Sequence, residues 1–352
     1  MSSFIQKIKE ETNNQYASIA EDGIVGGETT FVDTGSYSLN AAFSGSIYGG
    51  ISNRISVLAG EPAVGKTFFC LAIAKLFLDC NPTNEVVYFE SEGAITKDML
   101  SGRGIDLKRF LIMPVATVEE FRHQTVGILE MVKAKKEKDR PKILIFIDSL
   151  GSLSTEKEVT DITEGNSKKD MTRAGLLRGA FRVLSLQLGL LNIPLLATNH
   201  VYENIGGMFP EKIMGGGQGA AYGASTTIFL TKAKIKEGTE VIGNIISATV
   251  RKGRFTKEWS KVKTALDYVT GLDRYYGLLE LAEEAGIWTK TSTRFEVGDK
   301  KVFGKTIMDN PKEYFTKEVL DRIDKYTREK FMYGSDHTED DEPCFEDVQN
   351  AN

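Results

Sequence analysis

A glycine-flanked run ending in lysine and threonine is the segment of this sequence most suggestive of chemistry. The residues Gly60, Glu61, Pro62, Ala63, Val64, Gly65, Lys66 and Thr67 match the pattern GxxxxGK(S/T). In this pattern the glycines let successive backbone N–H groups curl around phosphates, the lysine reaches the β- and γ-phosphates, and the threonine hydroxyl ligates Mg²⁺. An apolar run precedes the motif and a helical pattern follows it, which puts a helix N-terminus at the phosphates. We therefore expect this run, with the adjacent Phe68, to bind ATP and Mg²⁺.

Polar side chains at the ends of other apolar segments supply the remaining chemistry. The run 143–147 ends at Asp148, a position from which a carboxylate holds Mg²⁺, usually through water. The run 86–90 leads into Glu90 and Glu92, and either carboxylate could activate a water molecule. We expect only one of the two to face the site. The run 193–198 leads into Asn199 and His200, and His200 is placed to donate a hydrogen bond to the γ-phosphate.

The elements that must position these residues are alternating strands and helices. Apolar, β-branched runs predict strands at 55–60, 85–90, 110–115, 142–148, 193–198, 226–230 and 244–250. Helical patterns at 67–80 and 117–138 lie between them, the first apolar nearly all round. Strands buried on both faces and alternating with helices indicate an α/β fold with a mostly parallel central sheet, covered on each side.

The two ends of the chain differ from this core. Residues 1–20 read as an amphipathic helix with Phe4, Ile5 and Ile8 on one face, placed to pack on a neighbouring subunit. After about residue 275 the pattern gives short helices at 277–286 and 311–331, with a strand-like piece at 294–304.

Composition and charge exclude several classes of protein. With 41% hydrophobic and 26% charged residues, the chain is not wholly disordered, collagen-like or a disulfide scaffold. We expect no membrane span and no signal peptide, and the three cysteines lack CxxC spacing, which fits a reducing cytoplasm. Segment 336–352 holds seven carboxylates and no Lys or Arg, so the chain without them carries +2 rather than −5. A mildly positive body with an acidic tail fits a regulated polyanion binder, and a merely solubilising tail is the alternative.

Taken together, the order of motifs resembles the RecA family of homologous-recombination ATPases, and within it the branch of the phage UvsX recombinases. The shared segments are GEPAVGKT, YFESEGAIT, ILIFIDSLGSL, KDMTRAGLLRGAFR, ATNHVYE and IMGGGQG, within residues 33–280. A generic P-loop ATPase would share only the first and third.

The resemblance implies a RecA-like ATPase core with additions at both ends. It divides the chain into an N-terminal polymerisation element (1–32), the core with its DNA-binding loops (33–275), a small α+β C-terminal domain (276–335) and an acidic disordered tail (336–352).

The same resemblance assigns roles that the residues alone leave open. It selects Glu92 over Glu90 as the general base. It makes Lys252 and Arg254 cations that reach a neighbouring subunit's γ-phosphate, the alternative being a solvated basic turn. Bacterial members stack an aromatic side chain on adenine where this chain has Met99, which leaves Tyr268 of the neighbouring subunit as the candidate.

DNA contacts are implied for two loops, about 154–169 and 201–214, and for residues near them. Apolar side chains among glycines in the second loop would wedge between bases, although packing into the core is the alternative. The candidates are Lys168, Lys169, Arg173, Arg182, Ile205, Met208, Phe209, Gly215, Gly216 and Gly217.

The function implied is an ATP-dependent DNA recombinase that forms filaments on single-stranded DNA and exchanges strands with double-stranded DNA. Its expected partners are a single-strand-binding protein and a recombination mediator, in a host cell's cytoplasm if a phage encodes it. A hexameric helicase on the same core and a non-catalytic, ATP-binding regulator are the alternatives.

Overall fold

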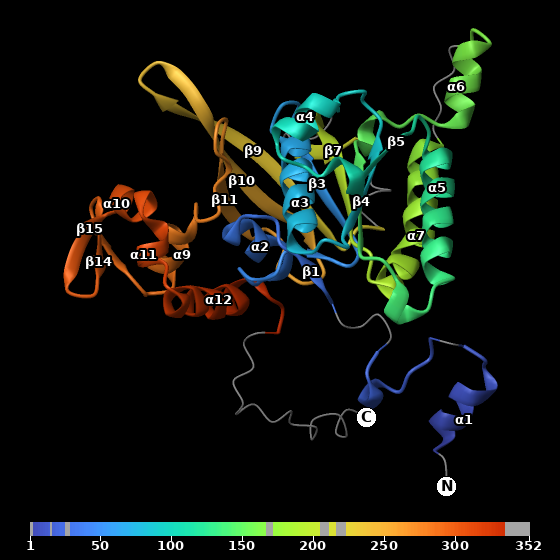
Figure 1. Ribbon diagram of the computed structural model, residues 1–352, viewed down its shortest axis with the longest axis horizontal. Helices are drawn as coiled ribbons and strands as arrows, with labels where there is room; N and C mark the ends of the chain where they lie inside the picture. Colours follow the sequence, from blue (N-terminus) through green and yellow to red (C-terminus); the bar gives the residue numbers. More distant parts are fainter. Residues whose placement is uncertain are drawn as a thin grey trace, which may run out of the picture.

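The computed structural model describes residues 3–14, 16–24, 29–166, 172–204, 211–215 and 223–334 (Figure 1). Within them the largest sheet has ten strands, in the order β12-β11-β10-β9-β3-β7-β6-β4-β5, with β8 paired to β7. The parallel strands are β3 (Ile55–Gly60), β4 (Glu85–Glu90), β5 (Phe110–Pro114), β6 (Ile143–Asp148), β7 (Leu195–Asn204) and β9 (Thr226–Glu237). The antiparallel strands are β8 (Glu211–Met214), β10 (Glu240–Gly253), β11 (Lys261–Asp267) and β12 (Gly271–Leu272).

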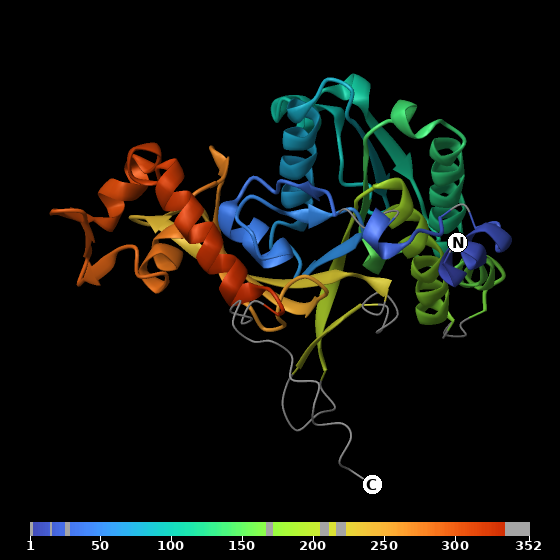
Figure 2. The same cartoon turned by 90° about the horizontal axis from the view of Figure 1, so that it is seen from below.

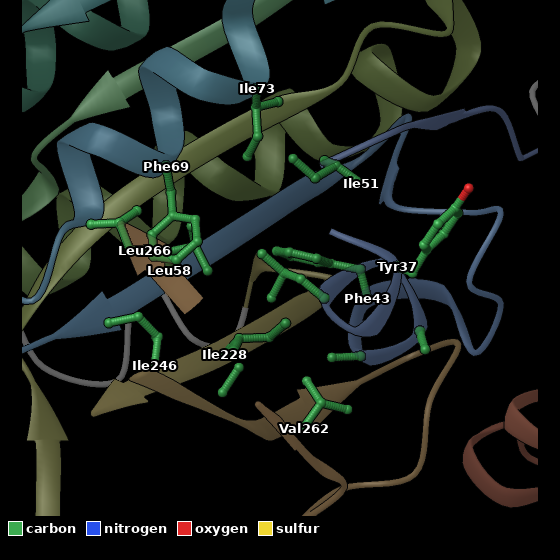
Figure 3. Close-up of a cluster of buried hydrophobic side chains, with 14 of the residues drawn as sticks. Tyr37, Phe43, Ile51, Leu58, Phe69, Ile73, Ile228, Ile246, Val262 and Leu266 are labelled. Atoms are coloured by element: carbon green, nitrogen blue, oxygen red, sulfur yellow. The ribbon is translucent and has the colours of Figure 1, made fainter. Parts of the chain in front are cut away.

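Helices cover the sheet on both faces. On one face α2 (Tyr37–Ser44) and α3 (Lys66–Cys80) enclose a core that includes Leu58 and Phe69 (Figure 3). On the other face α5 (Val118–Lys133) and α7 (Arg173–Leu191) enclose a second core with Val57. Successive strand residues therefore both find an apolar environment, which is why these strands are apolar throughout. The predicted α/β class with a mostly parallel sheet is confirmed.

The strand predictions at 55–60 and 85–90 coincide with β3 and β4, and the prediction at 142–148 is one residue longer than β6. The strand at 110–115 ends at Pro114, and the helix predicted over 117–138 ends at Lys133. Thr117 begins that helix with a capping box, in which its side chain accepts the N–H of Glu120. Buried runs with clear capping residues are thus found to within a few residues.

The antiparallel half of the sheet was under-predicted. The runs 226–230 and 244–250 are only the inner parts of one long hairpin, β9–β10, which turns at Gly238 with a φ of +60° (Figure 1). Most of the segment between the two runs extends the two strands, and Glu237 pairs with Glu240 across the tight turn, so the second strand returns antiparallel. The outer part of the β9–β10 hairpin includes the exposed Lys232, Lys234 and Lys236. Because these residues are polar, a search for apolar runs does not predict this part of the strands.

Both predicted DNA loops contain regular structure. In the first, Thr155 caps α6 (Glu156–Thr163) by accepting the N–H of Glu158. In the second, strand β7 continues to residue 204 and pairs with β8, so the described parts of 201–214 form a hairpin and not an open loop. The strand prediction at 193–198 stopped too early because polar residues follow it.

The N-terminal helix is shorter than predicted. Helix α1 (Phe4–Glu11) stops at Thr12, and Asn13 takes a left-handed φ of +50°, as expected for a polar turn sequence. All three apolar residues of its predicted face, Phe4, Ile5 and Ile8, are exposed in the single chain.

The C-terminal elements build their own small sheet. It consists of β13 (Thr289–Thr291), β14 (Arg294–Val297) and β15 (Lys300–Phe303), with α9 (Leu278–Glu284) and α10 (Gly304–Asp309) beside it. The helix predicted over 311–331 is interrupted: α11 (Pro311–Tyr314) ends before Thr316, which caps α12 (Lys317–Phe331). The domain boundaries of this region stay a prediction.

Helix α12 is fastened to the core beside α2 (Figure 2). The carboxylate of the buried Asp324 accepts the Ser46 hydroxyl at 2.5 Å and the Ile47 N–H at 2.9 Å, and it pairs with Arg328 at 2.7 Å. At the end of the helix Met332 pairs with Thr256, just beyond β10. The C-terminal helix therefore supports the turn that carries Lys252 and Arg254.

Short elements complete the described chain. They are β1 (Phe31–Val32), β2 (Ile51–Ser52) and α4 (Lys97–Gly102), with 3-10 turns at Ala20–Asp22, Leu107–Arg109, Glu137–Asp139 and Leu150–Ser152. Among the residues described, α7 is the one helix whose length and composition would also suit a membrane span; it packs along α5 and β3 as a core helix does.

Candidate nucleotide site and DNA-binding hairpin

The glycine-flanked run forms the turn between β3 and α3. The Lys66 ammonium lies inside this turn, where it donates to the backbone oxygens of Gly60 at 2.9 Å and Glu61 at 3.0 Å. Burial lowers the pKa of Lys66, and the nearby carboxylates of Asp148 and Glu92 partly offset that effect. Carbonyl contacts are weak substitutes for an anion, so a buried lysine held by two of them fits a phosphate group. Gly65, with a φ of +104°, precedes the helix and needs glycine's conformational freedom.

Oxygen ligands suited to Mg²⁺ lie directly beside Lys66. The Asp148 carboxylate accepts the Thr67 hydroxyl at 2.6 Å and the Tyr88 hydroxyl at 2.7 Å, and Thr198 donates to its other oxygen. No cluster of three metal-ligating side chains occurs in the part of the chain described. Mg²⁺ commonly takes one or two protein oxygens and completes its shell with water and substrate phosphates, so Thr67 and Asp148 fit this ion.

The two carboxylates after β4 have different surroundings. Glu90 accepts the backbone N–H groups of Glu92, Gly93 and Ala94 at 3.0, 2.8 and 2.9 Å, so it holds the turn together. Glu92 instead faces the hydroxyls of Ser149 at 2.6 Å and Ser152 at 3.0 Å. The geometry therefore makes Glu92 the carboxylate that is available for chemistry and Glu90 a turn residue.

His200 links Glu92 to Lys66. Its Nε2 is 3.1 Å from Glu92 Oε1, and its Nδ1 is 3.4 Å from the Lys66 ammonium. This network fits the tautomer with the proton on Nε2, since Nδ1 then accepts from lysine. Burial raises the pKa of Glu92, but hydrogen bonds from Ser149, His200 and Ser152 outweigh it, and the net shift is downward. Glu92 is thus held ionised and oriented.

The same strand end is tied to the hairpin of β7 and β8. The Asn199 amide donates to Gly215 O at 2.9 Å, and the Gly215 N–H donates to His200 O at 2.8 Å. The Gly215 N–H is thus used within the protein in this structure, and the DNA contact of Gly215 stays a prediction. A Cβ at Gly215 would come within 2.9 Å of the Tyr202 ring, so a larger residue would disturb the hairpin base.

A pocket of about 740 Å³ lies along α3, beside the phosphate-binding turn. Phe68, Met99 and Tyr268 line it together, with Arg103 stacked on the Phe68 ring at 5.4 Å. Its size and mixed lining suit a nucleoside. Tyr268 was expected from a neighbouring subunit, but here it lines the pocket of its own chain.

Lys252 and Arg254 lie at the opposite edge of the sheet. Lys252 pairs with Thr227, which itself pairs with Val57, three residues before Gly60. The offset is roughly 10 Å along the strand, directed away from the phosphate-binding turn. These cations therefore cannot serve the site of their own chain in this arrangement, and a role there requires a second subunit.

Most of the predicted DNA-contacting residues lie outside the described residues: Lys168, Lys169, Ile205, Met208, Phe209, Gly216 and Gly217. Arg173 is described, and its guanidinium donates to Leu150 O and Gly151 O at 2.9 and 2.5 Å, which fixes the turn that bears Ser152. Arg182 is exposed nine residues further along α7, roughly 13 Å from Arg173.

Sequence reasoning missed the residues that support the site. Tyr88 and Thr198 hold Asp148, Ser149 and Ser152 hold Glu92, and Lys212 pairs with Glu61. Hydroxyls at or just beyond the same strand ends were a usable signal for the first four. Lys212 had none, because its neighbour in space is 151 residues away in the chain.

Comparison of the sequence with known proteins shows the family of this chain. The family model described as the RecA N-terminal domain matches residues 17–273. The "Recombination and repair protein" of Enterobacteria phage T4 is 34% identical over 72% of this chain and 63% of its own length. "Protein RecA" of Chloroherpeton thalassium is 28% identical over 81% of this chain and 76% of its own, and that of Thermotoga maritima 26% identical over 85% and 82%. The chain belongs to the RecA family.

Proposed function

We propose that the chain is an ATP-dependent DNA recombinase. Its subunits would polymerise as a helical filament on single-stranded DNA, pair that strand with homologous duplex and exchange strands, in the cytoplasm of a host cell and with a single-strand-binding protein and a mediator as partners. Family membership and the printed name of the T4 relative support this. The observation that carries it is His200, which contacts both Glu92 and Lys66 while its backbone holds the base of the β7–β8 hairpin.

In this proposal ATP is hydrolysed by an oriented water molecule. Ser149, Ser152 and His200 all contact Glu92 Oε1, which leaves Oε2 to accept the proton of the water that attacks the γ-phosphate. General-base catalysis of this kind contributes typically about 10²–10⁴-fold. Ser149 and Ser152 hold the carboxylate in place. Lys66 leaves its two backbone carbonyls for the phosphates. Thr67 and Asp148 would hold Mg²⁺, which would neutralise phosphate charge.

Neighbouring subunits complete the site. Lys252 and Arg254 lie toward the edge of the sheet opposite the phosphate-binding turn. A head-to-tail neighbour would therefore bring its own Lys252 and Arg254 to the γ-phosphate. Cations supplied in trans contribute on the order of 10³-fold or more to phosphoryl transfer. This arrangement makes ATP turnover depend on assembly.

DNA binding is coupled to ATP through the hairpin. His200 turns toward the γ-phosphate, which moves β7 and positions the apolar residues 205–209 against the bases. Stacking on such side chains contributes about 1–3 kcal/mol per base in single-strand binders. ATP therefore raises the affinity for single-stranded DNA, and hydrolysis lowers it.

Electron microscopy with single-stranded DNA and a non-hydrolysable ATP analogue tests the proposal. Extended helical filaments that need both the analogue and DNA are the expected result. Closed hexameric rings would instead identify a helicase on the same core. Small complexes without DNA-stimulated ATP turnover would identify a non-catalytic regulator, and either outcome would overturn the recombinase.

A further inference from the structure

An ion pair joins the phosphate-binding turn to the second strand of the hairpin. The Lys212 ammonium on β8 lies 2.5 Å from Oε1 of Glu61, the second residue of that turn. A hydrogen bond and the charge of Lys212 hold the pKa of Glu61 below its usual range. The proposed hydrolysis does not use this pair.

Through this pair, both strands of the β7–β8 hairpin are linked to Lys66. On β7, His200 Nδ1 lies 3.4 Å from the Lys66 ammonium. On β8, Lys212 holds the side chain of Glu61, whose backbone oxygen accepts from that same ammonium at 3.0 Å. Both strands of one hairpin are therefore linked to the lysine that must move when phosphates arrive.

The exposure of the pair argues against a purely structural role. The side chains of Lys212 and Glu61 are 34% and 57% exposed, and exposed ion pairs contribute little to folding. The pair instead fixes the position of β8 relative to the phosphate-binding turn, because these two segments are not neighbours in the sheet.

We infer that Lys212 and Glu61 are positioning residues that transmit nucleotide binding from the phosphate-binding turn to β8 and so set how strongly ATP increases affinity for single-stranded DNA. When Lys66 turns to the phosphates, it releases the Glu61 carbonyl, the backbone of Glu61 relaxes, and its carboxylate carries Lys212 with it. The inference rests on the proposed function, since it assigns the hairpin to DNA.

The measurement is a coupling ratio, which is the dissociation constant for single-stranded DNA without the ATP analogue divided by the constant with it. The dissociation constant of a fluorescent oligo-dT is determined by anisotropy with and without the ATP analogue, at one fixed salt concentration. A lysine that merely touched DNA phosphate would change both constants alike and leave their ratio unchanged. With the analogue at a concentration that saturates every variant, only loss of communication lowers the ratio.

Four variants and one control define the expected result. Lys212→Met and Glu61→Gln should each lower the ratio about fivefold or more, and Lys212→Arg should keep it. The double reversal Glu61→Lys with Lys212→Glu should restore most of the ratio. The control is Lys234→Met, which removes an equal charge from an exposed position on β9; its ratio should stay near wild type.

Two results would overturn the inference. One is a wild-type coupling ratio in both Lys212→Met and Glu61→Gln. The other is a reversed double variant as impaired as the single variants. Both leave the recombinase proposal standing, whereas a wild-type protein that binds no single-stranded DNA with the analogue would overturn the proposed function and this inference together.

Discussion

The parallel and antiparallel halves of the central sheet are built from similar strands but hold different kinds of residue. The carboxyl ends of β3, β4, β6 and β7 bring Lys66, Glu92, Asp148 and His200 together, each with hydrogen-bond partners in the same chain. The antiparallel half carries Lys252 toward the opposite edge, level with Val57 and not with Gly60.

The difference follows from strand direction. Parallel strands all end at one edge, so a site can collect side chains from several of them. An antiparallel strand ends at the other edge, away from that site. In a polymer of identical subunits, this separates the residues that hold the nucleotide from those that complete its site. The following variants test that division.

The largest expected effect is on the parallel edge, for Glu92→Gln. Removing the base should lower the single-strand-stimulated kcat by about 10²–10⁴-fold while nucleotide binding persists. Glu90→Gln is the matched control two residues away, and because Glu90 holds only the turn, it should keep most of kcat. A steady-state ATPase assay compares them; equal losses would mean that the two carboxylates do not differ as described.

The next effect concerns the support of the antiparallel half, for Asp324→Ala. The change leaves the Ile47 N–H and the Arg328 guanidinium without their buried partner, at a cost of about 3 kcal/mol in the free energy of unfolding. Urea denaturation measures it. Asp321→Ala, an exposed carboxylate on the same helix, should cost much less, and an equal cost would contradict the anchoring of α12 through Asp324.

A smaller effect is predicted for the pH profile of Ser149→Ala. The Ser149 hydroxyl is the strongest of the interactions that lower the pKa of Glu92 against the opposing effect of burial. Without it the pKa of Glu92 rises, so the base becomes protonated at a higher pH. The acid limb of the rate–pH profile should shift upward relative to wild type, and less so for Ser152→Ala. An unmoved or lowered limb would show that these hydroxyls do not set the ionisation of Glu92.

The difference between the parallel and antiparallel halves of the sheet also explains what could be predicted from the sequence. Strands β3 and β4 are apolar on both faces and end in chemically distinctive residues, so their bounds could be predicted and a nucleotide site proposed. The outer parts of β9 and β10 are stabilised by pairing with each other, and their exposed lysines give no apolar signal. Long-range contacts such as Lys212 with Glu61 need the fold itself, since spacing in the chain does not encode them.

The choice between Glu90 and Glu92 shows the limit at one site. Residues two apart in a strand share a face, so alternation does not separate them, and the choice depends on the turn after β4. There three backbone N–H groups capture Glu90 and leave Glu92 to two serines and a histidine. Hydrogen bonding in the folded turn decides what the pattern left open.

The most direct test of the account mixes two inactive variants. Lys66→Ala removes the phosphate-binding lysine, and the double variant Lys252→Ala with Arg254→Ala removes the cations at the other edge; each alone should have almost no single-strand-stimulated ATPase activity. If neighbouring subunits share each site, an equal mixture should recover about a quarter of wild-type activity, because random assembly pairs an intact turn with intact cations at that share of interfaces. A mixture as inactive as its components would contradict a nucleotide site completed between subunits.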